Sequence, residues 1–355
     1  MPLDAHQLLS ELSQIPGASG FEAPIREKLH NLWTPYADAV EASPLGNLYA
    51  LRRGTGSTPR PSLALVAHMD TIGLMVKDIV ADVLRVSALG VPDPRVLLGQ
   101  RVMVLTEPPL PGLIVRPPDN CLPKEVKGRA ARIEELMVDL GLPASVLAEK
   151  VEVGTPLILD QPVVRLGDTR LAGPAFDNRA SLAALSLALE RLAEVELAWD
   201  VWAIATVQEE LFAAGAATAG FQLDPDVAVV IDTTFGSGPS HAGAGTFPLG
   251  GGVTNGWGPS VHPWVYSALQ AAADRLASPI AREVLPTLSS TDSDRLQTAA
   301  AGIPTGLVSI PIRNMHSAVE VADTADIEGA AALLADFASG LTVETITELP
   351  RGLGA

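Results

Sequence analysis

Four short, continuous apolar runs are the clearest elements in the hydrophobic pattern of the chain. They lie at 63–67, 201–207, 227–231 and 307–310. A continuous apolar run predicts a strand buried on both faces, because a half-exposed strand alternates apolar and polar residues. Helical patterns lie between successive runs, at 178–195 and 261–277. Strands alternating with helices favour an α/β fold with a mainly parallel sheet and helices on both faces.

Residues 73–165 have a different pattern. They are rich in valine and proline, with the strand-like pieces VLRVSAL, QRVMVLT and GLIVRPP, and they predict one short helix near 132–140. We expect a small β-rich domain inserted at this point, so that residues 1–72 and 166–355 form one discontinuous α/β domain. A later glycine-rich segment, 236–252, has no phosphate-binding motif and predicts a loop.

Composition narrows the possible partners. The chain of 355 residues has 24 Lys and Arg against 41 Asp and Glu, a net charge of -17. Such a chain lacks the basic patch of nucleic-acid-binding proteins and is repelled by anionic membranes, so we expect neither as a partner. No stretch approaches the length of a membrane span, and there is no signal-peptide pattern. A single cysteine excludes an intrachain disulfide and favours a cytoplasmic location.

Metal-binding residue types follow each of the four predicted strands. In chain order they are His68 and Asp70, Glu209 and Glu210, Asp232 and, after a short turn, His316. Open α/β sheets bind ligands outside the carboxyl ends of their strands, so we expect these side chains to gather there. Imidazole and carboxylate ligands without thiolates suit Zn²⁺, Co²⁺ or Mn²⁺.

Neighbouring residues suggest separate roles within such a site. His68 and Asp70 are two apart on an extended chain, so the Asp70 carboxylate could accept the second imidazole N–H and orient the ring. With Glu209 and Glu210 adjacent, one could bind metal while the other stays free as a base. Each residue also has a structural explanation. Acids favour the start of a helix, Asp177 could be an N-cap, and Asp232 could begin a turn.

Five sequence strings together resemble one enzyme family. They are AHMDTIGLMV (67–76), AFDNRAS (175–181), VQEELFAAGA (207–216), TD (291–292) and IPTGLVSIPIRNMHSAVEV (303–321). In order and spacing they are similar to the dinuclear metal aminopeptidases of metallopeptidase family forty-two, which include glutamyl and tetrahedral (TET) aminopeptidases. The resemblance spans most of the chain, including a β-rich insertion between the first two motifs.

The resemblance implies a role for each matching residue. His68 would bind one metal ion, Asp177 would bridge two, and Asp232 would complete the first site. The second site would be completed by Glu210 and His316. The general base would be Glu209, and Asp70 would orient His68. Two divalent metal ions per subunit are therefore expected.

The expected reaction is hydrolysis of the first peptide bond of a peptide, which releases its N-terminal residue. A metal-dependent deacylase or amidohydrolase acting on small amides is chemically close, and a non-catalytic assembly protein with this fold is a further alternative. A glycoside hydrolase fits less well, because adjacent glutamates cannot flank a sugar bond on opposite faces. The absence of G-x-S-x-G and HExxH disfavours serine hydrolases and single-zinc proteases.

Two departures from the family pattern concern the pocket, not the expected ligands. Thr71 stands where the family usually has Glu, and Phe212-Ala213-Ala214 replaces a more usual Gly-Leu-Arg. They bear on substrate preference. The resemblance also implies a homo-oligomer, with dimers formed through the inserted domain and possible assembly into a tetrahedral dodecamer.

Overall fold

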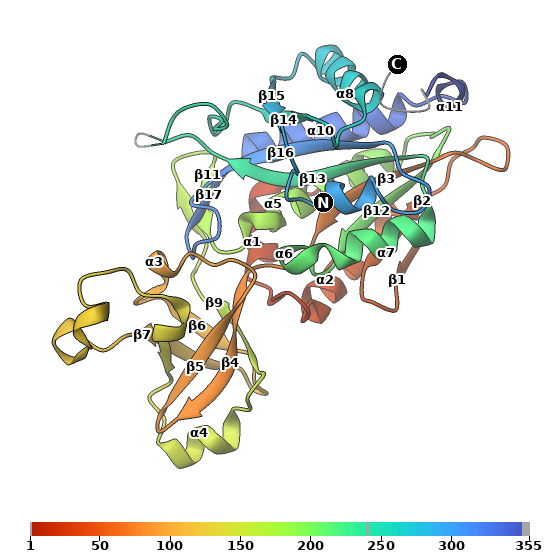
Figure 1. Ribbon diagram of the computed structural model, residues 1–355. Coiled ribbons are helices and arrows are strands. Elements are labelled where there is room, and N and C mark those ends of the chain that lie inside the picture. The colour runs from red at the N-terminus through yellow and green to blue at the C-terminus, as the bar shows by residue number, and fades with distance from the viewer. Residues whose placement is uncertain (1, 239–240, 350–355) are drawn as a thin grey trace.

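The buried runs of the sequence form the centre of one large sheet in the computed structural model, which describes residues 2–238 and 241–349 (Figure 1). This 11-stranded sheet has the order β1-β2-β12-β3-β13-β16-β17-β11-β10, with β14 beside β16 and β15 beside β14. Its strands are β1 (Ala39–Ala42), β2 (Leu48–Arg52), β3 (Ser62–His68), β10 (Val164–Leu166), β11 (Arg170–Gly173), β12 (Asp200–Thr206), β13 (Val227–Phe235), β14 (Val253–Trp257), β15 (Ile280–Val284), β16 (Thr305–Arg313) and β17 (Glu320–Asp323).

The sheet is mixed, which corrects the expectation of a mainly parallel one. The four predicted strands β12, β3, β13 and β16 are neighbours and run parallel. On one side β2 and β1 continue the sheet antiparallel, and on the other β17, β11 and β10 do so. The outermost strands β1 and β10 are short and largely exposed, so neither produces the continuous apolar run of a buried parallel strand.

Helices cover both faces of the sheet, as the sequence predicts. Along β3, Leu63, Leu65 and Ala67 belong to one hydrophobic cluster and Ala64 and Val66 to another, because side chains alternate between the faces. The first cluster includes helices α1 (Ala5–Ser13), α2 (Ala23–Trp33), α5 (Phe176–Leu192), α8 (Pro263–Leu276) and α10 (Thr324–Ser339), and the second includes α7 (Ala214–Leu223) and α9 (Ser293–Leu296). The other helical segments of the body are α6 (Glu209–Phe212), α11 (Thr345–Glu348) and the 3₁₀ turn η1 (Thr34–Tyr36).

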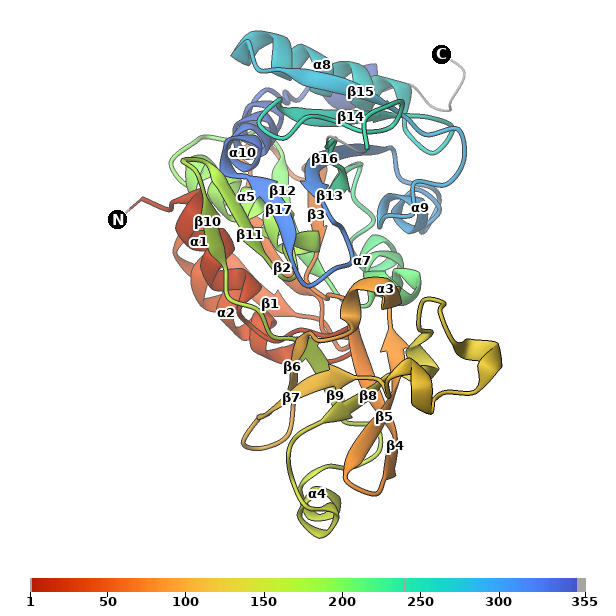
Figure 2. The ribbon, with the colours of Figure 1, turned by 90° about the vertical axis from the view of Figure 1, so that its left-hand side faces the viewer.

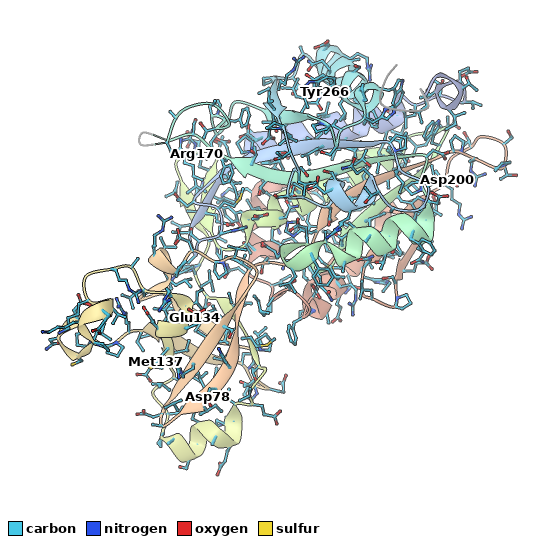
Figure 3. All side chains as sticks on the ribbon, in the orientation of Figure 1. Asp78, Glu134, Met137, Arg170, Asp200 and Tyr266 are labelled. Carbon is cyan, nitrogen blue, oxygen red and sulfur yellow. The ribbon has the colours of Figure 1, made fainter. Side chains whose placement is uncertain are left out.

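A closed six-stranded barrel projects from this α/β body (Figure 2). Its strands, all paired antiparallel in the order β4-β5-β8-β7-β6-β9, are β4 (Gly73–Val80), β5 (Val83–Leu89), β6 (Arg101–Val104), β7 (Leu110–Val115), β8 (Met137–Asp139) and β9 (Pro156–Leu159). Between them lie α3 (Pro94–Leu97), α4 (Ala144–Lys150) and the 3₁₀ turns η2 (Asp119–Cys121), η3 (Lys124–Val126) and η4 (Ile133–Glu135). The barrel has its own apolar cluster, separate from those of the body. Figure 3 shows its Asp78, Glu134 and Met137 apart from Arg170, Asp200 and Tyr266 of the body.

The short helix expected near 132–140 is wrong. Residues Ile133–Glu135 form a single 3₁₀ turn, and Met137–Asp139 is strand β8, which pairs with β5 and β7. Backbone pairing that closes the barrel outweighs the weak local helical pattern. The helix of this region lies later, at Ala144–Lys150.

Two further segments bear on the sequence-based expectations. The described residues of 236–252 form no helix or strand, as expected of a loop, while 239–240 lie outside the described residues. Over residues 2–238 and 241–349, no helix combines the length and apolar character that crossing a bilayer requires.

Candidate metal centre

The sheet brings two of the expected ligands together directly. His68 is the last residue of β3, and Asp232 lies in β13, the parallel neighbour of β3. Parallel neighbours end at the same edge of a sheet, so the imidazole and the carboxylate project into the same space. The remaining residues come from segments that follow strands or precede a helix. Asp177 is in the first turn of α5, Glu209 and Glu210 begin α6, and His316 is in the loop between β16 and β17.

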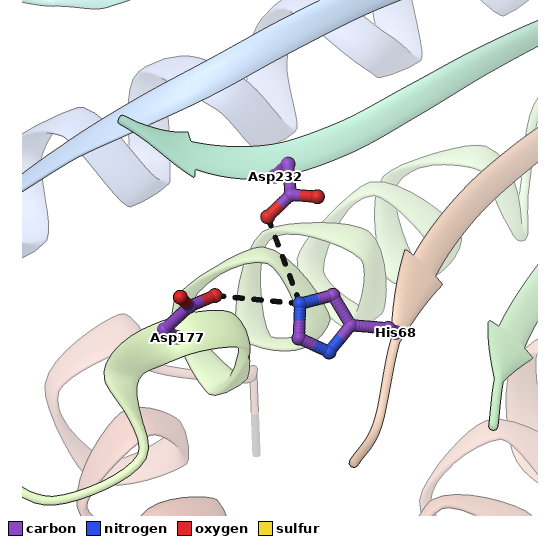
Figure 4. A group of neighbouring side chains, drawn as sticks. All are labelled: His68, Asp177 and Asp232. Carbon is purple, nitrogen blue, oxygen red and sulfur yellow. Dashed lines mark ion pairs between the residues drawn. The ribbon is translucent and has the colours of Figure 1, made fainter. Parts of the chain in front are cut away.

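His68, Asp177 and Asp232 form a deeply buried group (Figure 4). The His68 Nε2 atom lies 3.3 Å from Asp177 Oδ1 and 3.7 Å from Asp232 Oδ1. One potential ligand atom from each residue lies within 4.8 Å of the others. One imidazole facing two carboxylates is a donor set typical of a divalent transition-metal site.

Asp177, Glu210 and His316 form a second group that shares Asp177 with the first. His316 Nε2 lies 3.3 Å from Asp177 Oδ2 and 3.6 Å from Glu210 Oε2. The two oxygens of Asp177 thus face different histidines, as a carboxylate that bridges two ions would require. This group is more open than the first, since the His316 side chain is 30% exposed.

Glu209 lies beside the first group, and Asp70 holds the backbone of Glu209 and Glu210. Glu209 Oε2 is 3.9 Å from His68 Nε2. The Asp70 carboxylate accepts the backbone N–H groups of Glu209 at 2.9 Å and Glu210 at 3.1 Å, which fixes the start of α6. The sequence predicts that the Asp70 carboxylate orients His68, but the backbone carbonyl of Asp70 is nearer. His68 Nδ1 lies 3.0 Å from that carbonyl and 3.6 Å from the carboxylate. The carboxylate is thus held mainly by the helix N-terminus.

The protonation equilibria of the site are strongly perturbed. Burial raises the pKa of Glu209 to about 9, and the nearby carboxylates of Asp232, Asp292 and Asp70 add to the shift. Burial also raises the pKa of Glu210 well above its usual range. Burial acts against the charged imidazole of His68, but its carboxylate neighbours raise its pKa well above the usual value. These crowded carboxylates resist ionisation, and a nearby positive charge would stabilise their ionised forms and lower their pKa values.

Two buried oxygen atoms point to metal binding. Asp177 Oδ1 and Glu210 Oε1 are buried without a hydrogen-bond donor in the described residues. Buried carboxylate oxygens normally have such partners, so these atoms have free coordinating capacity. When His68 is neutral, as metal binding requires, its Nδ1–H donates to the Asp70 carbonyl and its Nε2 lone pair faces the same space. The residues present therefore fit divalent metal ions.

The backbone around these residues is unusual. Gln208, directly before Glu209, has φ 59°, Ala175 has φ 60°, and His316 itself has φ 62°. Non-glycine residues adopt this left-handed conformation infrequently, and it is found where a functional site constrains the chain. Asp177 does not act as an N-cap, the structural role considered for it. The cap position of α5 is Ala175, and Asp177 has non-helical dihedral angles.

Two buried acids of the site were not assigned a role from the sequence. Glu320 accepts the backbone N–H of Asp177 at 3.0 Å and that of His316 at 2.8 Å, so one carboxylate holds two candidate ligands. Asp292 accepts the hydroxyl of Thr206, and burial raises its pKa to about 7. Both acids lie inside the motif strings, but only the fold shows what they contact.

Comparison with known proteins decides the family. A sequence profile described as M42 glutamyl aminopeptidase matches residues 46–333, most of the chain. The chain belongs to this family. It is thus a metal-dependent aminopeptidase, an enzyme that hydrolyses peptide bonds. The resemblance inferred from the motifs is confirmed.

Individual proteins match this chain over nearly their whole length. The chain is 34% identical to lysyl aminopeptidase of Pyrococcus furiosus, covering 91% of this chain and 93% of the relative. A TET aminopeptidase from a marine sediment Thaumarchaeota archaeon has a TM-score of 0.91 at 27% identity, covering 98% and 99% of the two chains. The TET1 peptidase of Pyrococcus horikoshii, which can assemble into a tetrahedron or a large octahedral shell, has a TM-score of 0.83 at 27% identity, covering 95% and 100%.

Proposed function

We propose that this enzyme removes N-terminal residues from peptides with two divalent metal ions per subunit and Glu209 as general base. The observation that carries the proposal is the pair of three-residue groups joined at Asp177, with Glu209 at their edge. His68, Asp177 and Asp232 would hold one ion. The other would be held by Asp177 together with Glu210 and His316.

Each protein group has a defined task in this reaction. Bound metal ions would polarise the scissile carbonyl and lower the pKa of the attacking water. Glu209 would accept a proton from that water and deliver it to the nitrogen of the leaving amine. For this, Glu209 must be ionised. Burial raises its pKa to about 9, and positive charge beside it would offset that effect and lower the pKa again. Asp70 would keep Glu209 in place through the backbone of α6.

The donor set also limits the choice of metal. Nitrogen from two histidines and oxygen from carboxylates, without sulfur, favours Zn²⁺ or Co²⁺, with Mn²⁺ possible. We propose Zn²⁺ or Co²⁺ as the working ion.

We further propose that residues 1–72 and 166–355 form the catalytic domain and residues 73–165 an inserted domain for dimerisation and substrate access. The closed barrel with its own apolar cluster supports this division. Dimers would build a larger homo-oligomer of the tetrahedral dodecamer type, whose closed interior would admit only unfolded peptides. A cytoplasmic location stays a prediction from the single cysteine.

A panel of aminoacyl chromogenic substrates tests the proposed function. Metal-loaded protein should hydrolyse at least one member, lose activity in EDTA, and regain it when Co²⁺, Zn²⁺ or Mn²⁺ is added back. Metal analysis should give two ions per chain. Two bound ions without turnover of any member would contradict peptide hydrolysis and favour the deacylase. Light scattering tests the assembly, and a stable monomer would contradict it.

A further inference from the structure

The metal centre opens into a pocket of about 630 Å³ that also contains residues outside the two ligand groups. Much of its wall is apolar, formed by Leu211, Phe212, Phe235, Leu285, Leu288 and Met315. Several of these side chains are strongly exposed, with Phe212 at 58% and Phe235 at 56%. Exposed aromatic and aliphatic groups beside a reaction centre provide surface for a substrate side chain.

Three charged residues line the pocket outside the ligand groups and Glu209, and two of them have little to offer a substrate. Asp294 accepts the N–H groups of Ser289 and Ser290, at 3.0 and 2.8 Å, and thereby closes its own turn. Arg295 is exposed to solvent, where screening weakens the field of a single charge. The third charged residue is Glu283.

Glu283 is a fixed carboxylate without a cationic partner. Its two oxygens accept the hydroxyl groups of Thr234 and Thr254, both at 2.6 Å, and both threonines are buried. It forms no ion pair within residues 2–238 and 241–349. The adjacent Arg282 is engaged elsewhere, since its guanidinium lies over Trp257 and Tyr266. Glu283 is thus a half-buried carboxylate with a fixed orientation that faces the pocket, and a cationic group of a ligand could pair with it.

The position of Glu283 relative to the metal centre indicates which part of a substrate it meets. Thr234, which holds it, follows Asp232 by two residues on β13, so their side chains share a face. At roughly 3.3 Å per residue, Thr234 lies about 6.6 Å farther along the strand than Asp232. The substrate's α-amino group is bonded to the carbon next to the scissile carbonyl, so it would stay near the metal centre. A long side chain of the N-terminal residue would extend toward Glu283.

We propose that this pocket selects peptides with an N-terminal lysine or arginine, whose cationic end pairs with Glu283. The inference rests on the proposed function, since it places the scissile bond at the metal centre. The methylene stem of the substrate side chain packs against Leu285 and the neighbouring apolar wall, and only the charged end reaches the carboxylate. An acidic N-terminal side chain is repelled by the same group.

Lysyl, norleucyl and glutamyl 4-nitroanilides test the proposal on metal-loaded enzyme. Norleucine has the lysine stem without its charge, so the ratio of kcat/KM for lysyl over norleucyl substrate measures charge recognition alone. We expect a ratio of at least about 10 in the wild type, falling with added salt, and the lowest value of kcat/KM for the glutamyl substrate. Glu283→Gln should lower kcat/KM for the lysyl substrate at least about tenfold more than for the norleucyl substrate.

Asp294→Asn is the matched control, because it removes the other carboxylate that lines the pocket outside the ligand groups and Glu209. It should change lysyl and norleucyl turnover by the same factor. A wild-type ratio of one or less, a preference for the glutamyl substrate, or an unchanged ratio in Glu283→Gln would each overturn the proposal. The salt dependence in the wild type remains decisive if Glu283→Gln does not fold. Hydrolysis of other aminoacyl substrates but of none of these three would overturn this proposal alone, whereas failure on the whole aminoacyl panel would contradict the proposed function.

Discussion

The α/β body and the barrel bury different kinds of side chain. Every buried polar or charged side chain of the described residues lies in the body, and none lies between 73 and 165. In the barrel, charges pair near the surface, as Glu135 does with Arg129 and Arg132. Burying a charge is costly unless it is compensated, so a cluster of buried acids indicates chemistry and not stability. The body contains the reaction centre, and the barrel is held by apolar packing.

The two regions meet at the more open side of the metal centre. Gly90, directly after β5, lies so close to Glu210 that a Cβ atom there would be 3.1 Å from Glu210 Oε2. The N–H of Asp93 donates to the His316 carbonyl at 3.2 Å. The Asp177–Glu210–His316 group is therefore partly supported by the barrel, whereas the His68 group depends on the sheet.

The largest effect should come from the acid that we assign to proton transfer. Glu209→Gln should lower kcat by about 10²–10⁴ because the amide cannot accept the proton of water. Metal content and melting temperature should stay near those of the wild type. Glu149→Gln, on an exposed position of α4 in the barrel, is the matched control and should be fully active. Full activity in Glu209→Gln would sink the assignment of the base.

A smaller loss is expected when Glu320, which holds two candidate ligands by their backbones, is changed. In Glu320→Gln the side-chain NH₂ group faces one of the two backbone N–H donors and cannot accept its hydrogen bond. Asp177 and His316 should therefore shift. We expect metal affinity to fall by about 10–100-fold, with activity largely recovered at saturating metal. Titration of apoprotein with Co²⁺ or Zn²⁺ measures it. Glu328→Gln, at a partly exposed position of α10 paired with Arg191, should titrate like the wild type. Identical curves for the two variants would disprove the positioning role of Glu320.

Gly90→Ala tests whether the barrel supports the open side of the centre. Gly90 has φ +72°, and an added Cβ would meet Glu210 and, at 3.0 Å, Ile72. Gly99→Ala is a close control, because Gly99 has φ +81° but nothing within 4 Å of an added Cβ. Both variants should lose about 1–2 kcal/mol of stability from the backbone conformation. Only Gly90→Ala should also bind the second metal equivalent more weakly. Equal metal binding by the two variants would show that the barrel does not support the metal centre.

The smallest effect should come from the barrel's own ion pairs. Hydrogen bonds from Arg129 lower the pKa of Glu135 to about 2, with Arg132 adding to the effect. Because the folded-state pKa lies below the unfolded value, this stabilisation is complete above about pH 4.5 and disappears as the pH falls toward 2. Glu135→Gln should therefore melt slightly below the wild type at pH 7, and the difference should shrink from pH 5 to 3. Its activity at pH 7 should be unchanged. A difference that grows on acidification would contradict the sign.

Sequence reasoning succeeded where a local pattern has only one physical meaning. The continuous apolar runs gave β12, β3, β13 and β16, and polar residues at their ends gave candidate ligands that the structure brings together. It failed where several weak patterns compete. The antiparallel outer strands and strand β8 are short and lack a distinctive periodicity, so pairing partners decide their conformation.

The sequence by itself determined the central strands, the types of ligand at their ends and, through motif strings, the enzyme family. These depend on neighbours in the chain or on residue order, which a sequence records directly. Only the tertiary structure decided that Glu320 holds Asp177 and His316, that Asp70 fixes the start of α6, and that Glu283 faces the pocket without a counter-ion. Asp177 and Glu320 are 143 positions apart, and hydrogen bonding between buried groups depends on distance in space, which no local pattern encodes.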